Sequence, residues 1–301
     1  MRGAQRGLLP DGRWHFQHGP IDIVIGADGD AAAVQAAHDA AWARFQTLLT
    51  ELVAELALLR QPVAADAVAN PLRGEVARYM WVACAPLVAD ADGFITPMAA
   101  VAGAGAQALI AAYQRPGINR AWVNNGGDIA LHLAPGASAR VGLYADLSRF
   151  DGPTLARTAT GSLCTDAAFA VQAADPVRGV ATSGWRGRSL SRGIADSVTV
   201  LAAGAAMADA AATVIANAVD VADPAIERRP ANQMRDDSDL GERLVTVGVP
   251  ALAPAQVQRA LQRGEAMARR LQSRGLVHAA LLACQGSLAR VDALPALELV
   301  Q

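Results

Sequence analysis

Two stretches of very small side chains constrain the fold of this chain more than any other feature. Residues 96–113 read TPMAAVAGAGAQALIAAY and residues 201–219 read LAAGAAMADAAATVIANAV. Alanine favours helix formation, and small side chains let a neighbouring backbone approach closely. We therefore expect two helices that pack tightly against another helix, a sheet or a ligand. Their similarity indicates a duplicated α+β unit, although Ala-rich helices also resemble one another through composition alone.

Hydrophobic spacing divides the rest of the chain into further helices and strands. Apolar residues at helical spacing predict a long amphipathic helix over residues 31–60, stopped by Pro62. Thr96 followed by Pro97 is typical of a helix N-cap. We expect one domain over residues 1–301, with a core at about 13–250 and a C-terminal helix and strand in 251–301. Strands are expected within 19–30, 121–135, 140–147, 177–204 and 245–252, with a charged loop over 223–244.

The charge pattern excludes several classes of protein. The formal net charge is −2, so a nucleic-acid or anionic-membrane partner is not expected. All 26 basic residues are Arg, which excludes Schiff-base catalysis and a P-loop lysine. No stretch is apolar enough to span a membrane. The three Cys are far apart in apolar surroundings, and the N-terminus lacks a secretory pattern, so we expect buried thiols and a cytoplasmic protein.

The helix over residues 205–219 carries one carboxylate and one hydroxyl. Asp209 and Thr213 are four residues apart and therefore share a helix face. Together they offer the hard oxygen ligands that Mg²⁺ prefers. The alternative is structural: Asp209 interacts with the helix dipole, and Thr213 bonds back to a carbonyl of its own helix.

Two Gly-rich segments are candidate ligand-binding sites. Asn125, Gly126, Gly127 and Asp128 form a polar corner between two apolar runs, where backbone N–H groups are open to an anion and the side chains can bond to a ribose or base. The alternative is a simple hairpin turn.

The second segment is the loop over residues 181–193, ATSGWRGRSLSRG. Its hydroxyls, glycines and three Arg suit a phosphate or pyrophosphate, because Arg binds such groups bidentately. The alternative is a polar loop without a ligand. We expect the ligand to be bound by Thr182, Ser183 and Gly184. Of the three Arg, Arg188 is the candidate for neutralising the charge of a reacting phosphate.

These segments, in this order, resemble the ApbE superfamily, whose best-known members are FAD:protein FMN transferases. The resemblance is carried by VNNGGDI, ATSG and the small-residue helix with D-x-x-x-T. HGPID, TPMAAVAGA and SLSRGIADSVTV are typical of an uncharacterised branch of that superfamily. The resemblance implies an α+β fold, a duplicated α/β unit with mainly antiparallel sheets. It also implies that Mg²⁺ is held by Asp209, Thr213 and the carbonyl of Ala100, with FAD or FMN bound beside it.

The chain also departs from the transferases in ways that affect function. Gly103 stands where they carry a Lys, and the short WRGRSLSRGIAD replaces their insertion with His-Ile-Ile-Asp-Pro. The resemblance therefore supports binding of Mg²⁺ and a nucleotide diphosphate better than it supports FMN transfer. Three hypotheses follow: a Mg²⁺-dependent transferase acting at a pyrophosphate through Asp209 and Arg188, a non-catalytic flavin or pterin carrier or sensor, and an unrelated enzyme on this scaffold. The acceptor and the oligomeric state stay open, a homo-oligomer included.

Overall fold

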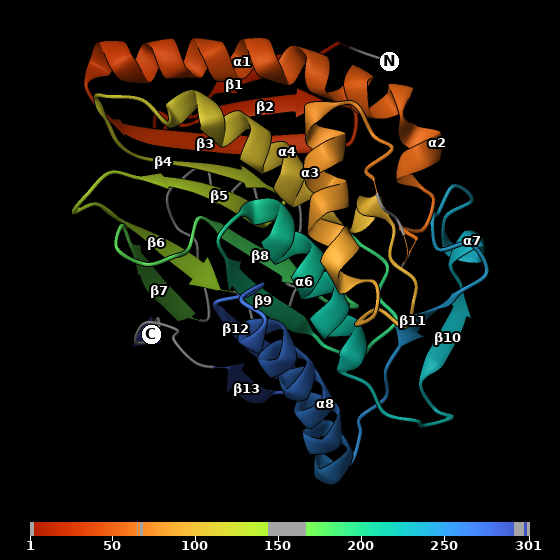
Figure 1. Cartoon of the computed structure of the whole chain (residues 1–301). Helices are drawn as coiled ribbons and strands as arrows, with labels where there is room; N and C mark the ends of the chain where they lie inside the picture. Colours follow the sequence, from red (N-terminus) through yellow and green to blue (C-terminus); the bar gives the residue numbers. More distant parts are fainter. Residues whose placement is uncertain (1–2, 65, 67–68, 144–166, 292–297, 300–301) are drawn as a thin grey trace.

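A single antiparallel sheet of nine strands organises the chain. The computed structural model describes residues 3–64, 66, 69–143, 167–291 and 298–299. Neighbouring strands pair in the order β1-β2-β3-β4-β5-β8-β9-β12-β13 (Figure 1). Their bounds are β1 Gln5–Leu8, β2 Trp14–His18, β3 Ile21–Gly29, β4 Ile118–Asn125, β5 Asp128–Leu133, β8 Gly179–Ser183, β9 Ser197–Ala202, β12 Ala279–Cys284 and β13 Ser287–Val291.

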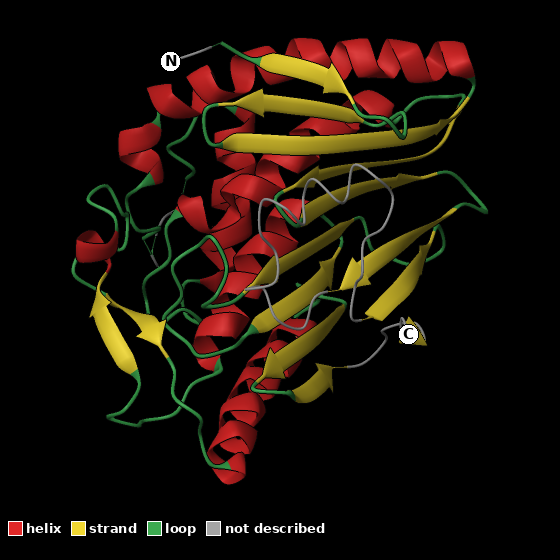
Figure 2. Ribbon diagram, turned by 180° about the vertical axis from the view of Figure 1, so that it is seen from behind, coloured by secondary structure: helices red, strands yellow, loops and turns green. Residues whose placement is uncertain are grey.

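The helices cover one face of this sheet, as the front and back views show (Figures 1 and 2). Residues on alternating positions of a strand point to opposite faces. Along β5, Ala130 belongs to the core under the helices, whereas Leu131 packs in a second cluster with Phe169. The helices are α1 Ala31–Ala54, α2 Leu56–Leu59, α3 Glu75–Cys84, α4 Val101–Ile110, α6 Ala205–Ala218 and α8 Pro254–Ser273.

Two smaller sheets complete the described fold. The second apolar cluster joins the main sheet to a three-stranded sheet of β6 Ser138–Leu143, β7 Ala167–Gln172 and β14 Glu298–Leu299. A separate hairpin of β10 Glu227–Pro230 and β11 Leu244–Gly248 carries the short helix α7 Ala231–Met234 between its strands. No helix in the described part of the chain has the length and apolar character needed to cross a membrane.

The predicted duplication is confirmed by the topology of the main sheet. In each half, two strands are followed by helices and then by two more strands: β2-β3 and β4-β5 in one half, β8-β9 and β12-β13 in the other. The equivalent helices are not the two small-residue helices compared in the sequence. α4 precedes the third strand of its half, as α8 does, whereas α6 follows the second strand, as α1 does. The similarity of α4 and α6 is therefore compositional.

Several local predictions need correction. Thr96 makes no capping hydrogen bond, because its hydroxyl donates to Asp239 instead. The helix expected over residues 31–60 is interrupted at Glu55, where α1 ends and the short helix α2 follows. Residues 97–100 form a 3-10 turn before α4 begins, and the expected loop over 223–244 contains β10 and α7. Cys84 and Cys284 are buried free thiols as expected. Residues 144–147 of an expected strand, and Cys164, lie outside the described residues.

Candidate functional site

Helices α4 and α6 meet at a contact that only glycine permits. A Cβ atom at Gly103 of α4 would lie 2.2 Å from the carbonyl oxygen of Ala205 and 2.8 Å from the Cβ of Asp209. On the other side of α6, a Cβ at Gly179 of β8 would lie 2.3 Å from the backbone nitrogen of Ala205. The start of α6 is thus held between α4 and the sheet. This packing fixes the backbone of Asp209.

The Asp209 carboxylate lies against the first turn of α4. Its Oδ2 accepts a hydrogen bond of 2.9 Å from the backbone N–H of Gly103, and the N–H of Ala102 also bonds to it. The cap residue of α4 is Ala100, which has no side-chain acceptor. Asp209 therefore supplies from another helix the acceptor that the free N–H groups at a helix start require.

Asp128 is a second carboxylate beside Asp209. It is buried at the start of β5 and accepts a 3.2 Å hydrogen bond from the backbone N–H of Thr182. Burial raises the pKa of Asp128 to about 7. Burial, and then the charge of Asp128, raise the pKa of Asp209 well above its ordinary value. Two buried carboxylates, one of which disfavours the charge of the other, form a site that a cation would stabilise.

The Gly-rich corner is both a hairpin turn and part of this site. Asn125 pairs with Asp128 across the hairpin, and Gly126 and Gly127 have φ values of 68° and 114°. These positive values are what a two-residue hairpin requires. The Nδ2 group of Asn125 donates a 3.0 Å hydrogen bond to the carbonyl of Ala102, which ties the turn to α4.

Arg188 reaches this corner from the loop between β8 and β9. Its Nη2 atom lies 1.7 Å from where a Cβ of Gly126 would stand, so a side chain at that position would displace the guanidinium. The charge of Arg188 acts to lower the pKa values of both Asp128 and Asp22. The other two loop arginines lie elsewhere: Arg186 pairs with Asp196 and Arg192 with Asp92.

The remaining predicted residues contribute mainly through their backbone. Thr182 contacts Asp128 with its N–H, whereas its hydroxyl bonds at 2.9 Å to that of Thr199 across the strand pair. A Cβ at Gly184 would lie 2.5 Å from the carbonyl oxygen of Asp196, so the end of β8 packs closely on that segment. Ser183 is partly buried at the end of β8, and Ala100 is buried at the end of the 3-10 turn.

The donor set fits Mg²⁺ by its chemistry. Thr213 is partly exposed, and its hydroxyl makes no hydrogen bond to another described residue, so the expected bond back to its own helix is not found. Carboxylate, hydroxyl and carbonyl oxygens are ligands that Mg²⁺ accepts, together with water. Within the described ranges, no group of three or more His, Cys, Asp or Glu side chains is arranged to hold a metal. A Mg²⁺ site here would therefore use few carboxylates.

The sequence reasoning missed a His–Asp pair next to Arg188. His15 of β2 and Asp22 of β3 are 2.9 Å apart, between Nε2 and Oδ1. Asp22 is the last residue of the HGPID motif, which was noted without assigning it a role. A His and an Asp seven residues apart across a Gly-Pro turn were a usable indication, because such a turn places two strands side by side.

This pair predicts a pH dependence of stability. The hydrogen bond to Asp22 raises the pKa of His15 above 6.5, and the same bond lowers the pKa of Asp22. The pair's contribution to the free energy of unfolding is complete below pH 6.5, and it is lost as the pH rises through the raised pKa of His15. It is also lost in acid, where Asp22 takes up a proton. Both side chains are 35% exposed, so solvent screening limits the contribution to about 0.5 kcal/mol.

Urea unfolding at pH 6 and pH 8 tests this prediction. The free energy of unfolding of the wild type should fall between these values by more than that of His15→Asn. Asp22→Asn removes the other partner and should show the same shallower dependence as His15→Asn. Equal pH dependence of all three proteins would contradict the role of the pair.

Comparison with known proteins places this chain within a family. A family model described as AbpE bacteria matches residues 6–290. A UPF0280 protein of Methanosarcina acetivorans is 32% identical over 216 residues, which cover 71% of this chain and 75% of the relative. A UPF0280 protein of Methanospirillum hungatei is 38% identical over 130 residues, which cover 43% of this chain and 47% of the relative. For that relative the alignment thus spans less than half of its length.

Solved structures of flavin transferases are also similar to this chain. The apo form of the Pseudomonas stutzeri flavinyl transferase ApbE matches with a TM-score of 0.46 and 13% identity, over 97% of this chain and 93% of that one. The Vibrio cholerae flavin transferase ApbE matches with a TM-score of 0.48 and 12% identity, over 97% of both chains. The family match over nearly the whole sequence confirms the predicted resemblance: this chain belongs to the AbpE bacteria family and is an ApbE-like protein.

Proposed function

We propose that the chain binds FAD, or a related nucleotide diphosphate, with Mg²⁺ at the corner formed by Asp209, Asp128 and Arg188, and that it transfers the FMN part of FAD to an acceptor. One observation carries the proposal: two neighbouring buried carboxylates, both with raised pKa values, lie beside an arginine held against a Gly-Gly turn. Such a site suits a divalent cation and a diphosphate together, since each neutralises the other.

Asp209, the Thr213 hydroxyl and the Ala100 carbonyl would hold the metal. Bound Mg²⁺ would supply positive charge that polarises a phosphoryl oxygen. Asp128 adds negative charge next to Asp209, which favours a cation at this position. The flavin transferases among the solved structures similar to this chain agree with a flavin substrate.

Arg188 would bind the pyrophosphate from the opposite side. Its guanidinium makes no ion pair with a described residue, so its donors are open to a ligand. Arg188 then takes the place of the lysine that other superfamily members carry at the position of Gly103. The Gly127 N–H already donates to the Oδ1 of Asn124, so the N–H of Gly126 and the segment of Thr182, Ser183 and Gly184 would complete the contacts to the nucleotide.

Turnover of FAD tests the transferase proposal. Purified protein incubated with FAD, Mg²⁺ and a mixture of acceptor proteins should release AMP, and chelation with EDTA should stop the release. Arg188→Ala should lower kcat/KM by about 100-fold, the loss expected when a charged contact to a reacting phosphate is removed. Arg186→Ala removes the same charge from the same loop, but from a group that faces Asp196, and should leave turnover unchanged.

A non-catalytic carrier is the second candidate. The observation that favours it is the bond from Gly103 to Asp209, which gives this carboxylate a purely structural use. A carrier would co-purify with a flavin or pterin, retain it in the Asp209→Ala variant, and release no AMP. Absorbance and mass spectrometry of the purified protein distinguish the two functions. Absence of turnover with every nucleotide diphosphate tried would overturn the transferase proposal.

A further inference from the structure

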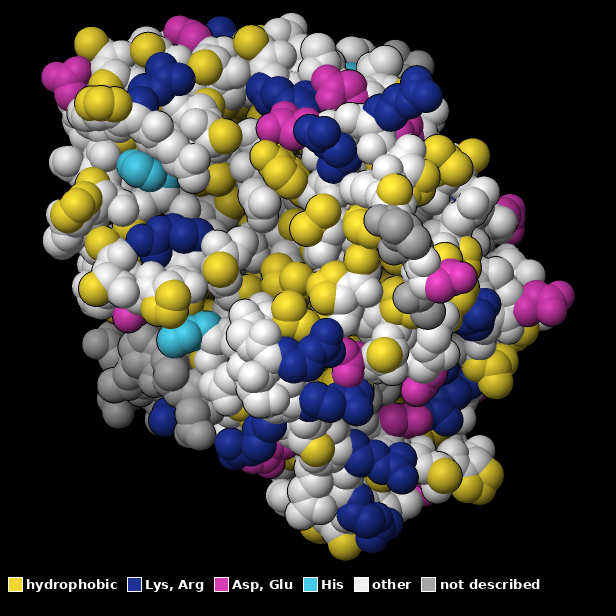
Figure 3. Space-filling model, in the orientation of Figure 1, with side chains coloured by type: hydrophobic (Ala, Val, Ile, Leu, Met, Phe, Trp, Pro, Cys, Tyr) yellow, Lys and Arg dark blue, Asp and Glu magenta, His cyan; other side chains and the backbone are white. Residues whose placement is uncertain are grey.

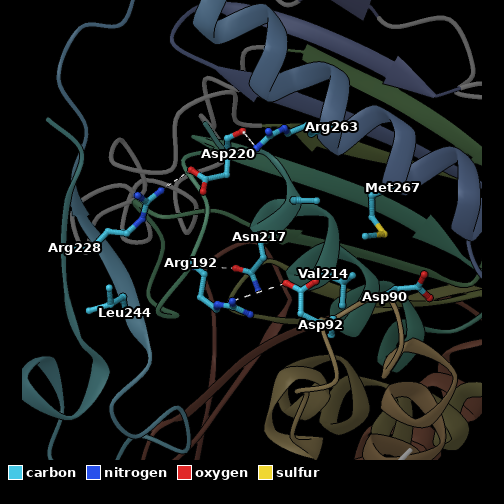
Figure 4. Close-up of a pocket in the computed structure, with 12 residues that line it drawn as sticks. Asp90, Asp92, Arg192, Val214, Asn217, Asp220, Arg228, Leu244, Arg263 and Met267 are labelled. Atoms are coloured by element: carbon cyan, nitrogen blue, oxygen red, sulfur yellow. Dashed lines mark hydrogen bonds and ion pairs between the residues drawn. The ribbon is translucent and has the colours of Figure 1, made fainter. Parts of the chain in front are cut away.

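A cavity lies beside the C-terminal half of α6, and Asp209 does not line it. Its volume is about 360 Å³. It is enclosed by α6, α8, the β10–β11 hairpin and the segment around Asp90 (Figure 4). Val214 and Asn217 of α6 line it, five and eight residues after Asp209, which is about 8 and 12 Å along the helix axis. None of the residues proposed for Mg²⁺ lines this cavity.

Three arginines enter the cavity from three different segments of the chain. Arg192 comes from the loop before β9, Arg228 from β10 and Arg263 from α8. Arg228 pairs with Asp220 at 2.5 Å, and Arg263 donates to the carbonyl of Asp220 at 3.2 Å. Arg192 approaches Asp92 only to 3.9 Å, and the Asp92 side chain is 86% exposed. The guanidinium of Arg192 is therefore weakly held and open to a ligand.

The charges around the cavity sum to a positive value. Asp90, the most buried of its carboxylates, is already paired with Arg270 of α8 and with Arg274, the residue that follows α8. Three guanidinium groups and three carboxylates line the cavity, but the charge of Asp90 is neutralised by Arg270 and Arg274, which do not line it. The three lining arginines are therefore left with the two carboxylates of Asp92 and Asp220. In Figure 3, basic side chains gather over α8, with acidic ones among them. An excess of guanidinium groups at one hollow favours an anion.

The rest of the lining suits a ring next to that anion. Val214, Leu244 and Met267 form apolar parts of the wall. The Oδ1 of Asn217 accepts from the Ser191 hydroxyl and from the backbone N–H of Arg192, which orients its amide and leaves Nδ2 as a donor. A cavity of this size lies within the range of small-molecule sites, about 300–1,000 Å³.

We propose that this cavity binds a phosphate monoester on a ring-bearing group, of the size of a nucleoside monophosphate. The phosphate contacts Arg192 and Arg263, and the ring packs on the apolar wall beside Asn217. The site is independent of the proposed FMN transfer, because it shares no residue with the Mg²⁺ corner.

Calorimetric titration with AMP, adenosine and inorganic phosphate tests the proposal. The wild type should bind AMP more tightly than either of the other two, because only AMP occupies both parts of the cavity. Arg192→Ala and Arg263→Ala should each weaken AMP binding by about five-fold or more, as expected for charged hydrogen bonds. Arg259→Ala removes an exposed arginine of α8 that does not line the cavity, and should leave binding unchanged.

The same titration separates this proposal from two others. If the arginines only stabilise the end of α6, their variants will lower the melting temperature without changing AMP binding, and the proposal fails. If Asp209→Asn abolishes AMP binding while Arg192→Ala and Arg263→Ala do not, AMP occupies the Mg²⁺ corner and the proposal also fails. Failure of FAD turnover alone would leave the expected titration results unchanged.

Discussion

Asp209→Asn is expected to abolish Mg²⁺-dependent AMP release from FAD while leaving the protein folded and at least as stable as the wild type. The amide keeps the size of the side chain and an oxygen that can accept from the Gly103 N–H. It removes a negative charge that burial and Asp128 disfavour, so the free energy of unfolding above pH 7 should not decrease. Turnover should fall by about 1,000-fold, the scale on which loss of charge at a reacting phosphate acts.

Two measurements on the same samples check this result. AMP release is followed by chromatography, and stability by thermal unfolding. Asp223→Asn changes a partly exposed aspartate that accepts a hydrogen bond from Gln256, and should leave turnover unchanged. A purely structural Asp209 would show the opposite pattern, with turnover kept and stability changed.

Gly103→Ala is expected to be the most destabilising of the substitutions considered. The added methyl would stand 2.2 Å from a backbone oxygen of Ala205, which cannot move without shifting α6. Overpacking of this kind costs about 3 kcal/mol or more, which outweighs the gain of about 1 kcal/mol from placing Ala in a helix. Chemical unfolding should show this loss, and FAD turnover should fall with it because Asp209 lies in the same contact.

Gly105→Ala is the matched control on the same helix. Its added methyl would first meet the Nδ2 of Asn125 at 3.4 Å, an ordinary contact distance. Because Ala favours helix formation more than Gly does, the free energy of unfolding should be unchanged or higher by about 1 kcal/mol. Equal effects of Gly103→Ala and Gly105→Ala would contradict the close contact between α4 and α6.

The sequence was informative wherever local spacing determines structure. The helical character of residues 31–59, the hairpin at Gly126–Gly127 and the last helix from Pro254 follow from periodicity, turn residues and breakers, whereas the interruption at Glu55 does not. The duplication was predicted from the wrong pair of helices. Strand order determines which helices are equivalent, and strand order depends on contacts between residues far apart in the chain.

In the candidate site, too, the sequence predicts what local spacing determines and does not predict what depends on contacts between distant residues. Asp209 and Thr213 share a helix face through spacing alone. The sequence could not tell which arginine of the 181–193 loop reaches the Gly-Gly turn, because the loop path depends on anchors such as Asp196 and Asn217. The use of Asp209 to cap α4 could not be predicted either, since it requires two helices to meet at Gly103.

The metal site can be observed directly with Mn²⁺ in place of Mg²⁺. Crystals of the wild-type protein grown with Mn²⁺ and FAD should show an anomalous peak in contact with the Asp209 carboxylate and the Thr213 hydroxyl, with the FAD pyrophosphate on its other side, and crystals of Asp209→Asn should lack that peak. A saturated Mn²⁺ site elsewhere, or FAD bound at this corner with no metal next to Asp209, would contradict the account.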